Sequence, residues 1–386
     1  MAQIVLPHAD GSLHTYQAHR ASPYPQTVNT PFPREVYAAA HVVADPTNPD
    51  PWGKPKVDWD KTLAFRHHLW GLGFKIAEAM DTSQRGMGFD WANAQELIRR
   101  STADARHIPG ADLASGAGTD HLAAGEAKTL DDVIRAYEMQ VEYIEAQGGH
   151  VILMASRALA ALARSPDDYF KVYDRVLSGC SHKVILHWLG DMFDPALKGY
   201  WGSTDVATAM DCCLAIINAH AGTIDGIKIS LLEARYEIDL RRRLPSGVKM
   251  YTGDDFNYAE LIAGDDQGYS HGLLGIFDPI APAAAAALIK LGAGDRAGYE
   301  AILAPTVPLS RKIFEAPTQY YKAGIVFLSW LNGFQNHFTM VGGMQSARSI
   351  LHYAEIFRLA HEADLLLDID LAVKRMTHLC GVNGIS

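Results

Sequence analysis

The sequence lacks the features that mark a secreted, membrane or nucleic-acid-binding protein. It has four cysteines in 386 residues and no CxxC spacing, so neither a disulfide framework nor a thiolate metal site is expected. No run of about 18 apolar residues occurs and no apolar segment follows a basic start, so neither membrane insertion nor export is expected. Acidic residues outnumber basic ones by 44 to 34, which argues against binding to nucleic acid. We therefore expect a cytoplasmic protein with reduced thiols that acts on a small molecule.

What the sequence does contain is a regular alternation of short apolar runs and longer segments of helical period. Hydrophobic residues make up 48% of the chain, which is enough to bury a large core. The apolar runs predict strands at 37–44, 74–80, 111–115, 150–154, 183–188, 224–229, 248–252 and 272–277. The segments between them predict helices that include 59–71, 91–104, 129–147, 166–177, 203–220 and 231–244. Eight such repeats predict an α/β fold of the TIM (β/α)8 barrel type.

The barrel does not account for the whole chain. Residues 1–34 are polar and proline-rich around a short apolar run, and we interpret them as an N-terminal extension with a hairpin. The catalytic barrel is expected over residues 35–300. Glycines and prolines interrupt a helical pattern over residues 301–386, which predicts a C-terminal helical appendage. Its apolar segment 325–331 could cover the barrel or build a subunit interface.

Lys228 lies near the end of the predicted sixth strand. In a barrel of this kind the active site forms where the strands end and the following loops begin. Burial in an apolar lumen favours the neutral amine, and only that form attacks a carbonyl to make an imine. In the alternative interpretation Lys228 is a cation that binds a substrate carboxylate or phosphate, or pairs with Asp225. The position of Lys228 alone is compatible with both.

Several short motifs occur in register with the predicted strands. Val57-Asp58-Trp59 opens the first long helix, and Asp81-Thr82-Ser83 follows the second strand. Gly226-Ile227-Lys228 ends the sixth strand, Gly253-Asp254-Asp255 follows the seventh, and Gly272-Leu273-Leu274-Gly275 begins the eighth. Together these motifs resemble the dihydrodipicolinate synthase / N-acetylneuraminate lyase family of class I aldolases, as a divergent branch of it.

The resemblance implies an activity and a set of site residues. In that family the strand-six lysine forms an imine with a 2-keto acid, and paired hydroxyls after strand two hold the carboxylate. It therefore implies that Lys228 is the nucleophile and that Thr82 and Ser83 bind the substrate, whereas their alternative role is helix capping. Ser230 and the pair Asp254-Asp255 lie at the ends of strands six and seven and are further candidates for substrate binding.

Taken as a whole, the resemblance implies a Schiff-base lyase, aldolase or dehydratase. The expected substrate is a 2-keto acid or a compound derived from a keto-sugar. We expect no cofactor and no metal ion, no nucleic-acid or membrane partner, and a homo-oligomer, because the related family is commonly oligomeric.

Two departures from the family pattern alter this expectation. The strand-five segment in which the family carries a proton-relaying tyrosine is His187-Trp188-Leu189-Gly190 here. His187 could serve as general acid or base, or could be structural. Arg85 replaces the family's acidic residue after the paired hydroxyls, where it could clamp an anionic substrate group or pair with a neighbouring acid. These changes argue against the synthesis of dihydrodipicolinate itself.

Two other functions are compatible with the same barrel. A divalent ion in a sugar isomerase, epimerase or hydrolase could bind to His187, Asp191, Asp254 and Asp255, with Glu78 or Asp120. No HxH or HExxH spacing supports such a site. The third interpretation is a sugar-binding barrel without catalysis, since seven Trp and 16 Tyr could line a carbohydrate site. The cost of keeping a lysine in the lumen without a use argues against it.

Overall fold

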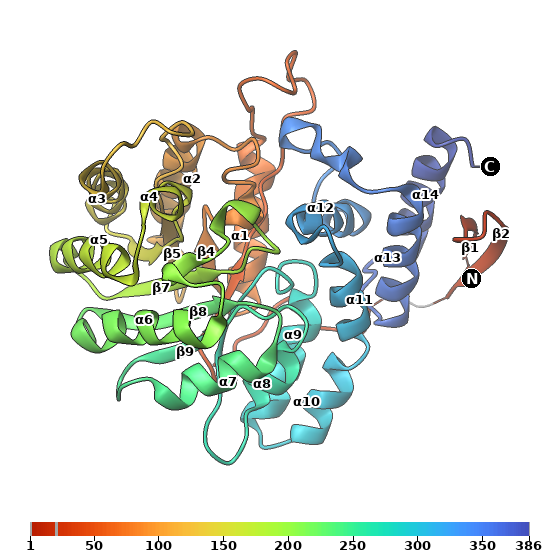
Figure 1. Ribbon diagram of the computed structural model, residues 1–386. Coiled ribbons are helices and arrows are strands. Elements are labelled where there is room, and N and C mark those ends of the chain that lie inside the picture. Colours follow the sequence, from red (N-terminus) through yellow and green to blue (C-terminus); the bar gives the residue numbers. More distant parts are fainter. Residues whose placement is uncertain (1, 20–21, 386) are drawn as a thin grey trace. The chain divides into compact units, whose positions relative to one another are not determined.

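The computed structural model describes residues 2–19 and 22–385 and contains a closed barrel of eight parallel strands (Figure 1). The strands follow one another around the barrel in sequence order, and the last pairs with the first. They are β3 (Val36–Ala39), β4 (Lys75–Glu78), β5 (Leu113–Ala117), β6 (His150–Leu153), β7 (Val184–Leu189), β8 (Ile224–Ser230), β9 (Lys249–Thr252) and β10 (His271–Leu274). The predicted TIM barrel is confirmed, and each of the eight predicted strand segments overlaps one of these strands.

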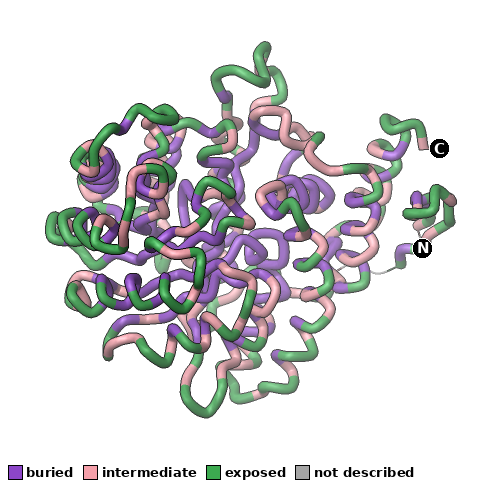
Figure 2. Tube along the Cα trace, viewed as in Figure 1, coloured by how far each residue is buried: buried purple, intermediate pink, exposed green. Residues whose placement is uncertain are grey.

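The strands form because their residues are suited to burial on both faces of the sheet. All six residues of β7 are buried, and six of the seven residues of β8 are buried. Such near-continuous apolar runs are typical of parallel sheets that helices cover on the outside. Figure 2 shows this burial as purple tube along the strands, whereas the outer loops are green.

The first strand is shorter than the sequence predicts. The expected strand 37–44 ends at Ala39, although the apolar run continues to Ala44. Beyond the strand the backbone finds other partners, since Val43 N–H donates to Thr62 Oγ1 at 3.0 Å and Asp58 N–H donates to Val43 O at 2.9 Å. The apolar run therefore predicts burial correctly, whereas the end of the strand at Ala39 depends on where the backbone finds its hydrogen-bond partners.

Side chains that alternate along the strands fill the lumen of the barrel. Neighbouring residues in a parallel sheet project to the same face, so the register fixes which side chains meet inside. A buried cluster closes the middle of the lumen and consists of Tyr37, Ala39, Ala77, Met80, Ala114, Ile152, Ile185, Tyr251 and Leu273. Ile185 pairs with Gly226, and two residues further along the same strands His187 pairs with Lys228. His187 and Lys228 thus lie on the lumen face, one layer nearer the carboxyl ends of the strands.

A network of ion pairs lies at the opposite end of the barrel, beside the amino ends of the strands. Lys75 Nζ lies 3.1 Å from Glu35 and 3.0 Å from Asp112. Lys249 Nζ lies 3.0 Å from Asp225 and also pairs with Glu35. Asp225 accepts a further hydrogen bond, of 2.7 Å, from the hydroxyl of Tyr251 in the lumen cluster. Asp225 is therefore engaged at this floor, away from Lys228.

The helices that follow strands β4 to β9 belong to the same compact unit as the barrel, which comprises Arg34–Ala40 and Lys75–Gly275. They are α2 (Trp91–Ala105), α3 (Leu130–Ala146), α4 (Arg157–Leu162), α5 (Pro166–Gly179), α6 (Val206–Ala219), α7 (Ala234–Arg243) and α8 (Tyr258–Ala263). Their starts follow local capping chemistry. Thr129 and Asp132, for example, form a reciprocal capping box at the start of α3.

The other compact unit comprises Met1–Pro33, His41–Phe74 and Ile276–Ser386. Its described part contains the antiparallel hairpin of β1 (Ala2–Pro7) and β2 (Leu13–Ala18), which confirms the predicted hairpin. Its helices are α1 (Trp59–Gly71), α9 (Ala281–Gly292), α10 (Arg296–Leu303), α11 (Thr306–Ile313), α12 (Tyr321–Leu331), α13 (Ile350–Glu362) and α14 (Ile369–Val382). In the described ranges no helix is both long enough and apolar enough to cross a bilayer.

Candidate active site

Lys228 occupies the lumen face of β8 near its carboxyl end. It lies opposite His187 of β7 on one side and opposite Tyr251 of β9 on the other. Only 5% of its surface is exposed, although lysine is among the residues that are almost never fully buried without a partner. The sequence therefore placed this amine on the correct strand, and the register accounts for its burial.

Gly253, the residue after β9, makes room for the lysine side chain. A Cβ atom at this position would lie 2.6 Å from Lys228 Cε, 2.3 Å from Ser230 Oγ and 2.8 Å from the carbonyl oxygen of Ile229. Real Cβ contacts do not occur at such distances, so the site requires glycine because of close approach. The first residue of the Gly253-Asp254-Asp255 motif thus has a steric role beside the amine.

The Lys228 amine is held without a direct ion pair. Among the described residues, none forms a hydrogen bond or salt bridge with its Nζ atom. Burial lowers the pKa of Lys228 below its ordinary value of 10.5, and the carboxylates of Asp81 and Asp255 oppose part of this effect. The environment therefore favours the uncharged, nucleophilic form more than water does.

His187 is the neighbour of Lys228 on β7. It is 1% exposed, and its Nε2 atom lies 3.5 Å from Ser230 Oγ. Its Nδ1 atom is buried and has no hydrogen-bond partner in the described part of the chain. Burial lowers the pKa of His187 well below 6.5, and the charge of Lys228 lowers it further, whereas Asp81 acts in the opposite direction. The imidazole is therefore neutral and has a ring nitrogen available at neutral pH.

The loop after β4 contains the predicted hydroxyl pair, Thr82 and Ser83, in the short 3-10 helix Asp81–Ser83. Both residues are buried. Ser83 Oγ donates to the carbonyl oxygen of Ala40 at 2.8 Å, and Ser83 N–H donates to Met80 O at 3.1 Å. Gln84 N–H donates to Asp81 O at 2.9 Å. The donors of Ser83 and Gln84 thus serve the shape of the loop.

Asp81 is the residue at this site to which the sequence assigned no role. Its charge acts on both Lys228 and His187, which makes it a shared electrostatic neighbour of the two groups. The signal was present in the motif itself, since Asp81-Thr82-Ser83 falls where the related family has Gly-Thr-Thr. A carboxylate in place of that glycine adds a negative charge that acts on the buried lysine.

Arg85 lies in the same loop, and protein acceptors use all of its donors. Its Nε atom donates to Asp120 at 2.9 Å, and one terminal nitrogen donates to the carbonyl oxygens of Ala79 (3.2 Å) and Gly116 (2.6 Å). The other terminal nitrogen donates to Asp120 and, at 2.8 Å, to Gln140. A guanidinium has five N–H donors, so this arrangement leaves none for a substrate. Two roles were predicted for Arg85, and the geometry matches the one in which it pairs with a neighbouring acid.

The two acidic residues after β9 have different surroundings. Asp254 accepts hydrogen bonds from Phe256 N–H at 2.9 Å and from Asn257 N–H and Nδ2 at 3.0 and 2.7 Å, so it shapes the turn. Asp255 is buried and acts electrostatically on Lys228. The structure therefore brings Asp255 to the amine together with His187 and Ser230, while Asp254 supports the backbone.

A buried His–Asp pair, to which the sequence gave no catalytic role, lies in the other compact unit. His41 Nδ1 lies 2.7 Å from Asp278 Oδ2, and the backbone N–H of His41 donates to the same oxygen at 2.8 Å. His41 Nε2 has no hydrogen-bond partner among the described residues. A carboxylate bound to Nδ1 fixes the imidazole tautomer. Only the spatial contact reveals this pair, since 237 residues separate the two positions.

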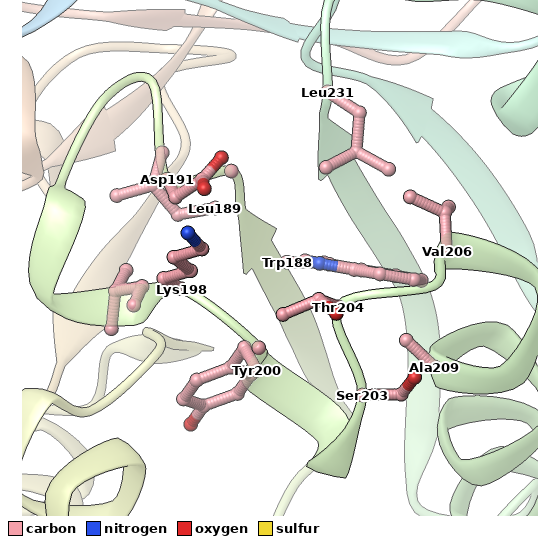
Figure 3. A pocket seen from close by; sticks show the side chains of 13 residues that line it. Trp188, Leu189, Asp191, Lys198, Tyr200, Ser203, Thr204, Val206, Ala209 and Leu231 are labelled. Atoms are coloured by element: carbon pink, nitrogen blue, oxygen red, sulfur yellow. The ribbon is translucent and has the colours of Figure 1, made fainter.

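A cavity of about 150 Å³ lies at the carboxyl ends of β7 and β8 (Figure 3). Trp188, Leu189, Leu231 and the loop before α6 contribute to its wall, and Asp191 and Lys198 supply its charged groups. Lys228 and His187 are not among its lining residues. The cavity is therefore a feature separate from the lumen amine.

The residues proposed for a divalent ion are dispersed. Within residues 2–19 and 22–385, no three His, Cys, Asp or Glu side chains are grouped so that they could hold a metal ion. Asp120 pairs with Arg85, and Asp254 holds the turn after β9. The described geometry does not favour the metal-dependent interpretation.

Comparison with known proteins identifies the family. The model of the family described as "Protein of unknown function (DUF993)" matches residues 4–385. The chain belongs to this family. A search of curated proteins finds no match.

Solved structures with the same fold are dihydrodipicolinate synthases and their relatives. YagE of E. coli K12, a prophage protein of that family solved in complex with pyruvate, is 13% identical with a TM-score of 0.65 and covers 86% of this chain and 99% of its own. The synthase from Aquifex aeolicus is 10% identical with a TM-score of 0.64, over 87% and 99% of the chains. DHDPS from Cyanidioschyzon merolae, with lysine bound, is 13% identical with a TM-score of 0.64, over 86% and 99%. The predicted resemblance is confirmed in the fold, and the low identity fits a divergent branch.

Proposed function

We propose that this DUF993 protein is a class I lyase or aldolase that forms a Schiff base between Lys228 and the carbonyl group of its substrate. The observation that carries the proposal is a buried lysine on the lumen face of barrel strand six with no direct ion pair among the described residues. A buried amine in this state has the lowered pKa that a nucleophile needs. The fold shared with YagE, which was solved with pyruvate, supports a small carbonyl compound as the ligand.

The chemistry begins with the neutral amine. The lone pair of Lys228 Nζ attacks the carbonyl carbon, the carbonyl oxygen gains a proton and the nitrogen loses one, which gives a carbinolamine. Protonation of the carbinolamine hydroxyl and loss of water then give a protonated imine with one positive charge. The bond between the α and β carbons breaks as the β-hydroxyl loses its proton and becomes the carbonyl of the departing fragment, and the electron pair of the bond moves to the imine to give a neutral enamine. Protonation of the enamine carbon and hydrolysis release the product and restore the amine.

His187 and Ser230 are suited to move the protons in these steps. A neutral imidazole can accept a proton from the carbinolamine or from the α carbon and return it later. Ser230 Oγ lies 3.5 Å from His187 Nε2, a distance at which small movements in a complex would complete the hydrogen bond. We assign His187 as the general acid and base, and Ser230 as the group that orients it.

Borohydride trapping tests the proposal. The folded protein is incubated with a panel of small ketones and aldehydes, sodium borohydride is added, and the modified residue is located by peptide mass spectrometry. We expect a covalent adduct at Lys228 whose yield reaches its plateau at a lower pH than that of exposed lysines, because the pKa of Lys228 is lowered. The variant Lys228→Met should lose the adduct, and Lys183→Met, which changes an exposed lysine before β7, should keep it. An undiminished adduct in folded Lys228→Met would exclude the proposed nucleophile.

A further inference from the structure

The charges and donors around Lys228 restrict the substrate that the site accepts. We infer that the substrate is a neutral polyhydroxylated carbonyl compound of the ketose type, with a hydroxymethyl group rather than a carboxylate next to the reacting carbonyl. This inference rests on the Schiff-base function proposed above. It selects one of the two substrate classes, keto-sugar and 2-keto acid, that the sequence left open.

The first argument is the negative charge already present at the amine. Asp81, in the loop after β4, and buried Asp255, two residues after the glycine that packs against Lys228 Cε, both act electrostatically on the amine. The imine that Lys228 forms carries one positive charge, which these carboxylates already compensate. A substrate carboxylate attached to the imine carbon would add a third negative charge to a buried group, and like charges in low-dielectric surroundings repel strongly. A neutral hydroxymethyl group adds none.

The second argument is that the two arginines in the loops after β4 and β6 are paired with protein acids. Arg85 spends its five N–H donors on Asp120, on Gln140 and on two backbone carbonyls. Arg157, the arginine after the fourth barrel strand, pairs with Asp194 at 2.5 Å and is half exposed. A buried anion without cationic or hydrogen-bonding compensation is costly.

Donors of Ser83 and Gln84 in the loop after β4 likewise bond within the protein. The Ser83 hydroxyl donates to Ala40 O, and the N–H groups of Ser83 and Gln84 donate to carbonyls of their own turn. These are the groups that would otherwise cradle an anion at a short helical turn. Asp81 begins this turn, so an anion placed there would lie next to a residue that already carries a negative charge.

The remaining polar groups match hydroxyls. Carboxylate oxygens of Asp81 and Asp255 can accept hydrogen bonds from substrate O–H groups, and they need no cation to do so. Ser230 can donate or accept, and neutral His187 presents a ring nitrogen. Such acceptors recognise the alternating hydroxyls of a sugar chain and offer little to a carboxylate.

Two matched pairs of carbonyl compounds test this inference by borohydride trapping at Lys228. Hydroxyacetone and pyruvate differ in bearing a hydroxymethyl or a carboxylate group next to the ketone, and D-fructose and 2-keto-D-gluconate differ in the same way. We expect the neutral member of at least one pair to give the adduct at a concentration about tenfold lower than its acid, since tenfold corresponds to about 1.4 kcal/mol of differential binding. Equal or better trapping of both acids would overturn the substrate class and leave the Schiff-base function intact. Trapping of none of the four would count against the Schiff-base function, and the substrate class would fall with it.

The variant Asp81→Asn tests whether the negative charge of Asp81 causes the preference for neutral carbonyl compounds. Asp81→Asn keeps the size of the side chain and removes the charge, so it should improve trapping of pyruvate relative to hydroxyacetone by about tenfold. Asp266→Asn, which changes an exposed loop carboxylate after α8, should leave the ratio unchanged. An unchanged ratio in a folded Asp81→Asn variant that still traps hydroxyacetone would refute the electrostatic argument.

Discussion

Lys228 and His187 face each other directly across two adjacent parallel strands, and burial disfavours the charged form of both. The charge of Lys228 also lowers the pKa of His187, so protonation of one group disfavours protonation of the other. Asp81 stabilises positive charge on either of them. The proposed proton transfers would thus take place between groups that burial and their mutual repulsion both hold toward the neutral form.

The role of His187 can be measured without knowing the natural substrate. A Schiff base with hydroxyacetone makes the protons next to the carbonyl exchangeable, and NMR in D₂O follows their replacement by deuterium. We expect His187→Gln to slow this exchange on the order of 100-fold, because proton transfer by a positioned side chain contributes rate factors of this size. Borohydride trapping at Lys228 should persist in the same variant.

Lys228→Met supplies the background rate for this experiment, and Ser230→Ala tests the orienting group. We expect Ser230→Ala to slow exchange less than His187→Gln does, since the serine acts through the imidazole. Exchange in His187→Gln at the rate of the unchanged protein would remove His187 from the proton-transfer steps.

The space beside Lys228 gives a steric prediction. Gly253→Ala places a methyl group 2.6 Å from Lys228 Cε and 2.3 Å from Ser230 Oγ. We expect a loss of stability of about 1–3 kcal/mol from overpacking and a marked fall in the rate of adduct formation. Denaturant unfolding and borohydride trapping measure the two effects.

Gly222→Ala is the matched control, because nothing lies within 4 Å of the Cβ that it adds. It should change neither the unfolding midpoint nor the trapping rate. If Gly253→Ala behaved like this control, Gly253 would not be packed closely against Lys228 and Ser230.

The saturated Arg85 predicts a structural phenotype. Its side chain is 1% exposed, so Arg85→Ala strands Asp120 and two backbone carbonyls and should cost about 3–5 kcal/mol of unfolding free energy. Arg99→Ala removes an exposed arginine that pairs with Glu96 and should leave the unfolding midpoint unchanged. If Arg85 bound the substrate instead, Arg85→Ala would reduce borohydride trapping at Lys228 and would leave the unfolding midpoint unchanged.

Glu237 predicts how stability depends on pH. It lies on the buried face of α7, Ser270 Oγ donates to it at 2.6 Å, and burial raises its pKa to about 8. Its folded pKa exceeds the ordinary value of 4.5, so the folded protein binds the proton more tightly than the unfolded chain does. The resulting stability is complete below pH 4.5 and is lost as the pH rises through 8.

Glu237→Gln cannot ionise, so we expect it to unfold at a higher urea concentration than the unchanged protein at pH 8 and above. The expected gain in the free energy of unfolding is on the order of a few kcal/mol. At pH 5 the two proteins should differ little. Urea titrations between pH 5 and 9 measure this, and the exposed Glu260→Gln serves as control. A pH-independent difference would show that Glu237 does not titrate in this range.

The features that were predictable from the sequence are those that local pattern determines. Each barrel strand is a short run of buried residues, so eight runs predicted eight strands, and Lys228 at the end of the sixth run had to lie near the carboxyl end of the barrel. Strand one shows the limit of this reasoning. Its apolar run extends past Ala39, but Thr62 and Asp58 supply the backbone partners there.

The features that were not predictable depend on partners far apart in the chain. The sequence left two roles for Arg85, and the outcome depended on where Asp120 and Gln140 lie in space. It proposed Ser83 for substrate binding, and the structure turns that hydroxyl toward the carbonyl of Ala40. Tertiary contacts decide whether a polar side chain is available to a substrate or is bonded within the protein. The spacing of residues along one strand does not determine these contacts.

The ion pairs that Lys75 and Lys249 make with Glu35, Asp112 and Asp225 plug one end of the barrel. Tyr251 caps this plug from above, between it and Lys228. We therefore expect access to the amine from the carboxyl end of the strands. In the proposed reaction the carbonyl compound, the water that hydrolyses the imine and the product would all use this one route, so occupancy by any one of them would delay the others.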